Sequence, residues 1–343
     1  MSRPLPFDID LPIIQAPMAG SQDSELALAV CSAGGLGSIP AAMLGPEALR
    51  AELQRLSREA SGPWNVNFFC HTPPTPDAAR EAAWRQALAP YYREFAIDPG
   101  SIPAGPGRRP FDAEALALLA EYRPLVVSFH FGLPEAALLA GVKALGAVVM
   151  SSATTVAEAR WLEAHGADVI IAQGLEAGGH RGMFLSTDLT TQVGTLALLP
   201  QILAAVSVPV VAAGGIADAA GVQAVLALGA SAAQLGTAYL LCPEARTSAV
   251  HRAALQSDAI EHTALTNLFS GRPARGMVNR LMRELGPISP LAPAFPLATG
   301  AVAPLRAAAE QAGSGDFSPL WAGQNARGCQ VVGAAELTRQ LGG

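Results

Sequence analysis

The segment Gln173–Gly182 (QGLEAGGHRG) holds the residue types best suited to chemistry in this chain. It follows the apolar run Asp168–Ala172, which indicates a short buried strand, and it then turns to Gly, Glu, His and Arg without a helical period. Gly178 and Gly179 permit backbone angles closed to other residues and let a ligand approach the main chain. The imidazole of His180 suits proton transfer or anion binding near neutral pH. Taken alone, the same letters also describe a glycine turn with a surface histidine.

Polar side chains stand inside or at the end of other apolar runs, where burial obliges them to hydrogen-bond. Asn67, Gln173 and Gln234 carry amides, which donate and accept at once and so match the alternating edge of a flavin or a base. Ser128 and His130 lie in a further run (LVVSFHF), where His130 could line a pocket wall, hydrogen-bond within the core or contact a substrate. Each amide could instead satisfy the neighbouring backbone.

The elements that must position these residues alternate between strand and helix patterns along the chain. Three strands follow a Gly-Ala pair, as when a helix ends on glycine and leads straight into a strand, and Thr155 with Glu158 forms a capping box before another helix. Eight strands with intervening helices favour an α/β TIM barrel, with a doubly wound open sheet as the alternative. The predicted strands are 13–18, 36–40, 64–69, 125–131, 147–152, 168–173, 209–213 and 232–240.

The barrel is predicted to occupy residues 1–242, followed by a mainly helical extension over 243–343. Residues 70–124 interrupt the regular pattern, are rich in Pro and Arg, and are interpreted as an excursion between two strands. Helices are predicted within it near 77–96 and 112–122. The extension is predicted to hold helices near 244–258 and 262–285, a Pro-rich piece over 286–304 and a final helical stretch.

Composition narrows the class of function. Of 343 residues half are apolar and 15% are charged, and the formal net charge is −6 without a basic run, which disfavours nucleic acid and anionic membranes as partners. The N-terminus lacks the apolar core of a signal peptide, and no two of the four cysteines form a CxxC pair, so we expect a reducing cytoplasm and neither zinc ribbon nor disulfide framework. Lys143 is the only lysine and precedes a strand, which disfavours Schiff-base enzymes. A monomer and a homodimer both remain open.

In a barrel the active site lies at the carboxyl ends of the strands, and phosphate is commonly bound after the last two of them. Gly214 and Gly215 follow one of these strands, and Gly236 and Thr237 stand in the other. We expect the backbone N–H groups of these glycines and the Thr237 hydroxyl to bind a phosphate, although the glycines could merely make tight turns. Asp218 is predicted to cap the next helix.

Seven motifs occur in order along the chain, and together they resemble those of the bacterial nitronate monooxygenases, formerly called 2-nitropropane dioxygenases. They run from about residue 11 to 242, with FSGRPARGM and LWAGQ as later elements, and GLEAGGHRG is the most specific. Ser21 departs from the pattern, since many relatives have a further glycine after PMAG. The motifs are IIQAPMAG, GGLGSIPAAML, VNFF, SFHFGLP, GLEAGGHRG, AAGGIAD and QLGTAYL.

The resemblance implies a TIM-barrel flavoprotein that holds FMN and uses O2 to oxidise alkyl nitronates such as propionate 3-nitronate to a carbonyl compound and nitrite, a detoxifying activity. His180 would be the active-site histidine, and His130 and Ser128 would contact substrate. The expected cofactor-binding residues are Met18, Asn67, Gln173, Gly178, Gly179, Gly214, Gly215, Gln234, Leu235, Gly236 and Thr237. No metal is expected.

Three alternatives stay open on the sequence. An NAD(P)H-dependent quinone or enoyl reductase would keep the barrel and FMN, because nicotinamide needs little more than an open flavin face. A metal-dependent hydrolase would use His71, His130 and His180, which all follow or end predicted strands. A catalytically silent nucleotide-binding barrel would use the glycine loops alone.

Overall fold

Eight parallel strands form the centre of the structure, a computed structural model that describes residues 3–102 and 107–343. Neighbouring strands follow the order β1-β9-β8-β6-β5-β4-β3-β2, and a parallel bridge between Ile14 and Leu36 joins the two ends of that order. The Leu36 amide donates to the Ile13 carbonyl over 2.9 Å. The sheet thus closes into the predicted TIM barrel, whose strands are β1 (Ile13–Gln15), β2 (Gly37–Pro40), β3 (Trp64–Phe69), β4 (Val126–His130), β5 (Val148–Ala153), β6 (Val169–Gln173), β8 (Val210–Ala213) and β9 (Ala232–Leu235).

The barrel interior is filled by alternate residues of its strands, because successive side chains of a strand point to opposite faces. On β6, Val169 and Ile171 join the inner cluster, whereas Ile170 packs outward among the helices. Phe7 from the N-terminal segment also packs into the inner cluster. Both faces of the strands are therefore buried against other side chains, which explains their nearly continuous apolar sequence.

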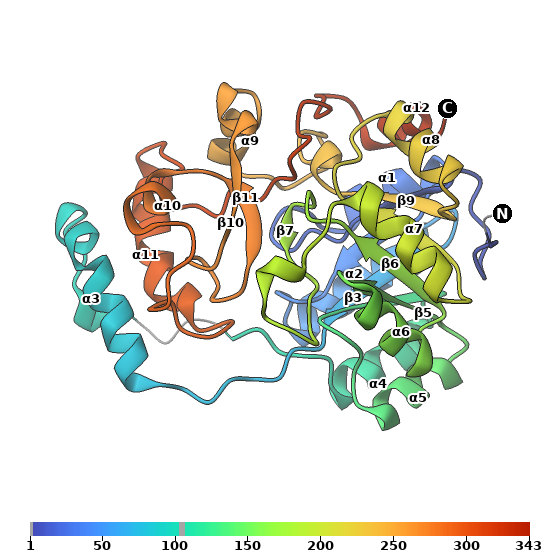
Figure 1. Cartoon of the computed structure of the whole chain (residues 1–343), viewed down its shortest axis with the longest axis horizontal. Helices are drawn as coiled ribbons and strands as arrows, with labels where there is room; N and C mark the ends of the chain where they lie inside the picture. The colour runs from blue at the N-terminus through green and yellow to red at the C-terminus, as the bar shows by residue number, and fades with distance from the viewer. Residues whose placement is uncertain (1–2, 103–106) are drawn as a thin grey trace.

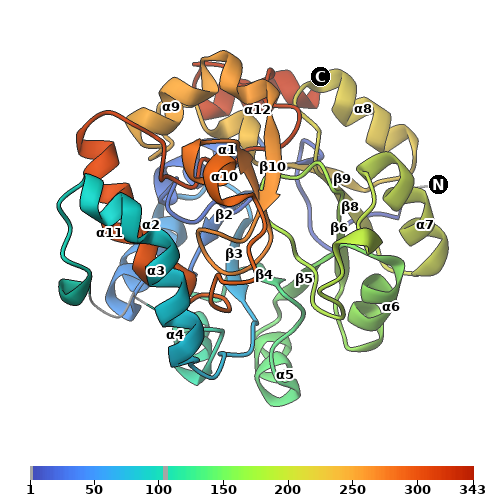
Figure 2. The same ribbon diagram turned by 60° about the vertical axis from the view of Figure 1, so that its left-hand side comes forward.

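Helices between the strands cover the outside of the barrel (Figure 2). Each of the three predicted glycine ends is left-handed, with φ of +84° at Gly146, +102° at Gly166 and +108° at Gly229, where a side chain would be strained. Asp218 caps its helix by accepting the amide of Gly221 over 2.8 Å. The covering helices are α1 (Ser24–Ser32), α2 (Pro46–Glu59), α4 (Ala113–Tyr122), α5 (Ala136–Ala144), α6 (Val156–Ala164), α7 (Thr195–Ala205) and α8 (Ala219–Ala227).

One predicted capping interaction is half wrong. The Thr155 hydroxyl does cap α6 by accepting the Glu158 amide over 3.2 Å. The Glu158 carboxylate does not return to Thr155, however; it accepts from the Thr154 amide over 2.7 Å and from the Phe184 amide over 2.6 Å. Glu158 is buried beneath the segment that follows His180, and that segment's amides need an acceptor.

The last helix of the chain completes the ring of helices. α12 (Ala334–Gly342) packs between α1 and α8, and its Leu337 and Leu341 belong to the core shared by helices and strands. The Tyr239 and Thr338 hydroxyls lie 2.9 Å apart in that core. The barrel is therefore finished by residues almost a hundred positions after its last strand.

A cap stands beside the barrel and consists of α3 (Ala78–Glu94), β10 (Thr263–Thr266), β11 (Ala274–Met277), α10 (Arg280–Leu285) and α11 (Ala298–Gln311). Figures 1 and 2 both show α3 lying along α11, so the predicted excursion meets the C-terminal third of the chain. Trp84 of α3 packs with Leu305 and Phe317 in a cluster separate from the barrel core. Of the excursion, residues 103–106 lie outside the described part of the chain.

Several predicted elements need correction. The helix predicted over 262–285 is wrong except for α10, because Gly271 (φ +89°) and Pro273 form a turn and β10 and β11 pair antiparallel on either side of it. The strand predicted over 232–240 ends at Leu235, where Gly236 leads into a 3₁₀ turn, η3 (Thr237–Tyr239). The helix predicted near 244–258 shortens to α9 (Ala249–Leu255) behind a Ser248 cap.

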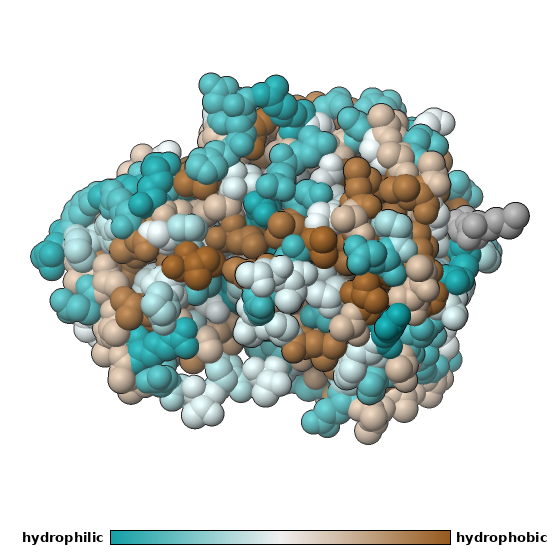
Figure 3. All heavy atoms as spheres, viewed as in Figure 1, coloured by the Kyte–Doolittle hydropathy of each residue, from teal (hydrophilic) through white to brown (hydrophobic). Residues whose placement is uncertain are grey.

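The surface mixes polar and apolar residues over the face shown in Figure 3. Leu196 of α7 is 63% exposed, and Leu185 is 48% exposed. Among the described residues, every helix is too short or too polar to span a membrane.

Candidate active site

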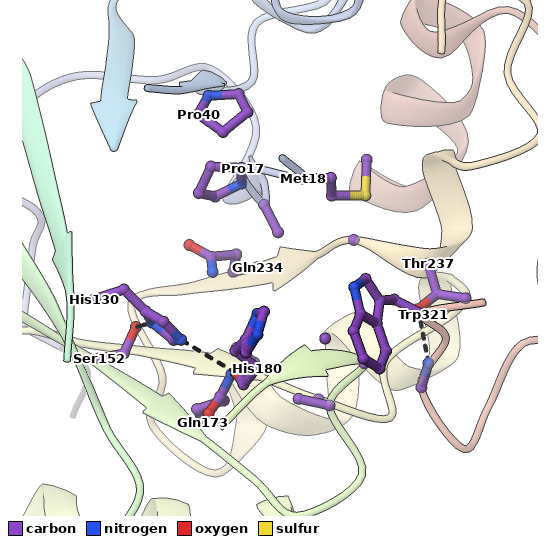
Figure 4. Close-up of a pocket in the computed structure, with 18 of the residues that line it drawn as sticks. Pro17, Met18, Pro40, His130, Ser152, Gln173, His180, Gln234, Thr237 and Trp321 are labelled. Atoms are coloured by element: carbon purple, nitrogen blue, oxygen red, sulfur yellow. Dashed lines mark hydrogen bonds between the residues drawn. The ribbon is translucent and has the colours of Figure 1, made fainter. Parts of the chain in front are cut away.

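All residues that the sequence predicts for the site line one pocket at the carboxyl ends of the barrel strands. Figure 4 shows side chains from opposite sides of the barrel converging there, with Met18 and Gln234 on one side and His130, Gln173 and His180 on the other. Met18 borders both the pocket and the apolar core. The barrel topology causes this convergence, because parallel strands end at the same rim.

His180 is held by a strand pairing that the sequence did not predict. Gly179 and His180 form β7, which pairs antiparallel with β11, with His180 opposite Ala274. Nε2 of His180 lies 2.8 Å from the Ser270 hydroxyl. Its Nδ1 bonds none of the described residues, so it is the ring nitrogen available to a ligand.

Aromatic rings enclose the His180 imidazole. The ring centroids of Phe295 and Trp321 lie 5.3 and 5.6 Å from it, and those of Phe131 and Phe69 lie 6.1 and 6.2 Å away. Burial, followed by the nearby His130 and cationic Arg108 and Arg272, holds the pKa of His180 well below its usual range. The imidazole is therefore neutral at pH 7 and offers one lone pair and one N–H.

His130 points at the backbone of His180. Its Nε2 lies 3.1 Å from the His180 carbonyl, and its Nδ1 lies 3.1 Å from the Ser152 hydroxyl (Figure 4). A carbonyl only accepts, so Nε2 carries the proton and Nδ1 accepts from Ser152. Burial lowers the pKa of His130 to about 4, which keeps this arrangement intact at neutral pH. With both nitrogens engaged, His130 positions His180 and offers no free nitrogen to a metal, so the described residues hold no three-histidine metal site made of His71, His130 and His180.

Gln173 braces the same segment. Its Nε2 donates to the His180 carbonyl over 3.0 Å, and its Oε1 accepts the Gly182 amide over 2.7 Å. Both polar atoms of the Gln173 side chain therefore bond to the backbone of the loop. This favours the interpretation that the amide satisfies neighbouring backbone groups over the interpretation that it is free to bind a ligand. Asn67 likewise donates to the Ser128 hydroxyl over 2.9 Å, which fixes Ser128 in the floor of the pocket.

Arg181 anchors the loop from below. It is fully buried, and its guanidinium donates to the carbonyls of Gly174 and Gln173 over 2.6 and 2.8 Å and to the Gln192 side chain over 3.0 Å. These bonds tie the end of β6 to the segment after His180. His180 thus lines the pocket, whereas its neighbour Arg181 is fully buried.

The opposite end of the pocket is lined by backbone. Gly214 and Gly215 have φ of +111° and +72°, which are conformations that favour glycine. Within the described residues, the amides of Gly215, Gly236 and Thr237 donate to no acceptor. Three outward N–H groups at the ends of β8 and β9 form a suitable site for a phosphate.

The floor between these two ends holds an unpaired polar atom. Gln234 Oε1 is buried, and no described residue donates to it. A buried amide oxygen without a donor is costly, so a ligand with an N–H or hydroxyl edge would stabilise it. A Cβ at Gly179 would meet no atom within 4 Å, whereas a Cβ at Gly178 would lie 2.6 Å from the Ala322 carbonyl carbon. Gly179 therefore borders open space, and Gly178 allows close packing of the chain.

The residues that the C-terminal third brings to the pocket were not predicted from the sequence. Asn325 donates to the Gly215 carbonyl over 3.1 Å, and the Gly323 amide donates to the Thr237 hydroxyl over 3.0 Å. Ser270 and Trp321 lie within FSGRPARGM and LWAGQ, so those motifs were the available signal. Arg108, within the excursion, also lines the pocket.

Comparisons with known proteins agree with this geometry. The chain matches the family model for nitronate monooxygenase over residues 6–342. A nitronate monooxygenase from Pseudomonas aeruginosa is 44% identical over 341 residues, covering 97% of this chain and 95% of that protein. Another from Paraburkholderia phytofirmans is 43% identical over 336 residues, covering 97% and 92%. The solved structure of a nitroalkane oxidase from Streptomyces ansochromogenes superposes with a TM-score of 0.88 at 41% identity, covering 97% and 95%.

A pocket at the strand ends with a neutral, enclosed histidine, together with a family match over nearly the whole length, leads to one conclusion: the chain belongs to the nitronate monooxygenase family of oxidoreductases.

Proposed function

We propose that this protein is an FMN-dependent monooxygenase that converts alkyl nitronates, such as propionate 3-nitronate, and O2 into a carbonyl compound and nitrite. The observation that carries the proposal is the position of His180. Its free Nδ1 lies in a pocket walled by aromatic rings, opposite the unpaired Gln234 and the open amides after β8 and β9.

The residues present fit FMN. The amides of Gly215, Gly236 and Thr237 would take its phosphate, and the carboxamide of Gln234 would meet the edge of its ring system. Met18 borders Gly236, since a Cβ at that glycine would lie 3.6 Å from the Met18 sulfur, so its thioether would flank the bound group. Bound FMN would supply the electron transfer between the nitronate and oxygen, which the side chains of this pocket do not provide.

The protein's own part is to hold and orient the substrate. When Nε2 of His180 donates to Ser270, Nδ1 bears a lone pair that can take a carbon-bound proton from a neutral nitroalkane. When Ser270 donates instead, Nδ1 bears the proton and can donate to an oxygen of a nitronate. The surrounding rings exclude water from either arrangement. His130 and Gln173 keep the His180 backbone in place throughout.

We infer a reducing compartment, the cytoplasm, for this activity. Cys31, Cys70, Cys242 and Cys329 are all free thiols, and the fold needs none of them as a cross-link.

The test is to purify the protein, record its visible spectrum and measure nitrite released from propionate 3-nitronate in air. We expect a yellow protein with flavin absorption bands, and we expect phosphate analysis of the extracted flavin to identify it as FMN. Nitrite should be released in step with oxygen uptake. A yellow protein that releases no nitrite from this or any simple alkyl nitronate would contradict the proposed activity while leaving the cofactor proposal standing.

A further inference from the structure

The wall of the pocket near His180 carries positive charge, and no carboxylate of the described residues lines it. None of the described residues that line the pocket is an aspartate or a glutamate, whereas Arg108 is among them. His71, His130 and His180 are all shifted toward their neutral forms, so they add no compensating or competing charge. A bound anion would complete the charge balance of this wall.

Arg108 and the next residue differ sharply in what they bind. Arg109 is exposed and forms ion pairs with Asp112 and Glu114, the latter over 2.8 Å. Arg108 is partly buried, and no carboxylate or carbonyl of the described residues accepts from its guanidinium. Burial lowers the pKa of Arg108, as expected for a cation withdrawn from water without a counter-ion.

A second cation stands behind the aromatic wall. The Arg272 guanidinium lies over the Phe131 ring, 4.0 Å from its centroid, and donates to the Met183 carbonyl. Its Nε is buried, and no described residue accepts from it. The Phe131 ring in turn lies 6.1 Å from the ring of His180. Arg272 is thus fixed by stacking. The Glu158 carboxylate offsets part of its charge, and the remainder adds positive potential to the pocket wall that Arg108 lines.

We propose that Arg108, assisted by the positive potential of Arg272, binds a planar two-oxygen anion next to His180. A guanidinium presents parallel N–H groups that match two coplanar oxygens, and the pairing strengthens out of water. The nitronate group has this form, and so does a carboxylate. The inference rests on the proposed function and deepens it: the preference for the anionic nitronate over the neutral nitroalkane comes from Arg108, and His180 is left to handle the proton.

The test compares ethyl nitronate with nitroethane, which differ by one proton, in the FMN-loaded wild type and in Arg108→Gln, Arg108→Lys and the control Arg109→Gln. Losing one charge-assisted pair should raise KM for ethyl nitronate about 10- to 100-fold in Arg108→Gln. KM for nitroethane should change less than about threefold, since the neutral form gains little from the charge. Arg108→Lys should recover part of the loss, because lysine keeps the positive charge but lacks the two parallel N–H groups of the guanidinium. Arg109→Gln should resemble the wild type.

Propionate gives a readout that does not depend on turnover. Titrated by calorimetry, it should bind the wild type and Arg109→Gln and bind Arg108→Gln at least about tenfold more weakly. Equal losses on ethyl nitronate and nitroethane, or unchanged propionate binding in Arg108→Gln, would overturn the assignment. Loss of FMN from Arg108→Gln would also overturn it, by placing the arginine on the cofactor. A wild type that turns over neither substrate contradicts the proposed function instead, and the arginine assignment is then decided by propionate alone.

Discussion

The pocket has two halves with different origins. The barrel half is formed by the loops after β1, β8 and β9 and by the floor of the barrel, and it offers backbone amides and carboxamides such as that of Gln234. The cap half is formed by residues from 108 and from 270–325, and it offers aromatic rings, the Ser270 hydroxyl and a guanidinium. His180 lies at their junction, because β7 leaves the barrel and pairs with β11 of the cap.

This difference separates two tasks. Backbone groups at strand ends are fixed by the barrel itself, so they suit a cofactor that must stay in one place. The side chains of the cap come from segments that the barrel does not constrain, so they can vary with the substrate. We therefore expect changes in the barrel half to affect FMN content and changes in the cap half to affect substrate discrimination.

The largest effect is expected from Gly215→Val. Gly215 has φ of +72° and lies where its amide would meet phosphate, so a branched side chain both strains the backbone and blocks the approach. We expect a folded but colourless protein with no activity on any substrate, measured by the flavin spectrum and circular dichroism.

Gly146→Val is the matched control for that change. Gly146 also has a left-handed φ, +84°, but ends a helix far from the pocket with no atom within 4 Å of the position of a Cβ. It should lose a similar stability, about 1–2 kcal/mol, and keep its colour. Retention of FMN in both variants would remove the phosphate from the β8 loop.

The next effect concerns the junction itself. Asn in place of His180 has a similar size but cannot take a proton, so turnover of neutral nitroethane should fall about 10²–10⁴-fold. Turnover of ethyl nitronate should fall less than about tenfold, because only a hydrogen bond to the nitro group is lost. FMN content should stay that of the wild type, since the barrel half is untouched.

His165→Asn, at the exposed end of α6, controls for the loss of an imidazole as such. Equal losses on the two substrates in His180→Asn would show that His180 binds the nitro group and moves no proton. Wild-type turnover of both substrates by His180→Asn would place the active site elsewhere.

The last effect is the acid sensitivity of two buried histidines, one after β3 of the barrel and one in α9. Burial lowers the pKa of His71 and of His251 to about 4, below the unfolded value of 6.5. Each neutral histidine therefore contributes its full stability above pH 6.5, and that contribution is lost as the pH falls from 6.5 to 4, up to about 3 kcal/mol each. Denaturant unfolding at pH 7 and 4.5 should show the loss, and His251→Gln should show less of it. A pH-independent unfolding free energy over this range would contradict these buried neutral histidines.

The barrel half of the site could be predicted from the sequence because its signals are local. An apolar run followed by Gly214 and Gly215, or by Gly236 and Thr237, marks a strand end wherever it occurs, and all strand ends of a barrel meet. The family motifs cover the same segments. Even in the barrel half, the side-chain amide of Gln173 bonds to the backbone of the loop that carries His180. The sequence around one glutamine does not reveal which backbone groups lie next to it in the fold.

The cap half could not be predicted because its contacts join distant segments. His180 and Ser270 are 90 positions apart, and Tyr92 donates to the Ala301 carbonyl across 209 positions. β10 and β11 are four residues each, too short to outweigh the helical pattern around them, and they exist through pairing with each other and with β7. Arg108 gave no signal at all beyond being one arginine of an irregular stretch.

The most direct test of the central claim is rapid mixing of the purified protein with ethyl nitronate in the absence of oxygen, followed in the visible spectrum, with NADH in a parallel run. We predict that the nitronate changes the flavin spectrum at least as fast as steady-state turnover, that admitted oxygen restores it with release of nitrite, and that NADH changes it far more slowly. Rapid loss of the yellow colour with NADH, together with an unchanged spectrum on adding nitronate, would contradict the account and assign the pocket to a reductase.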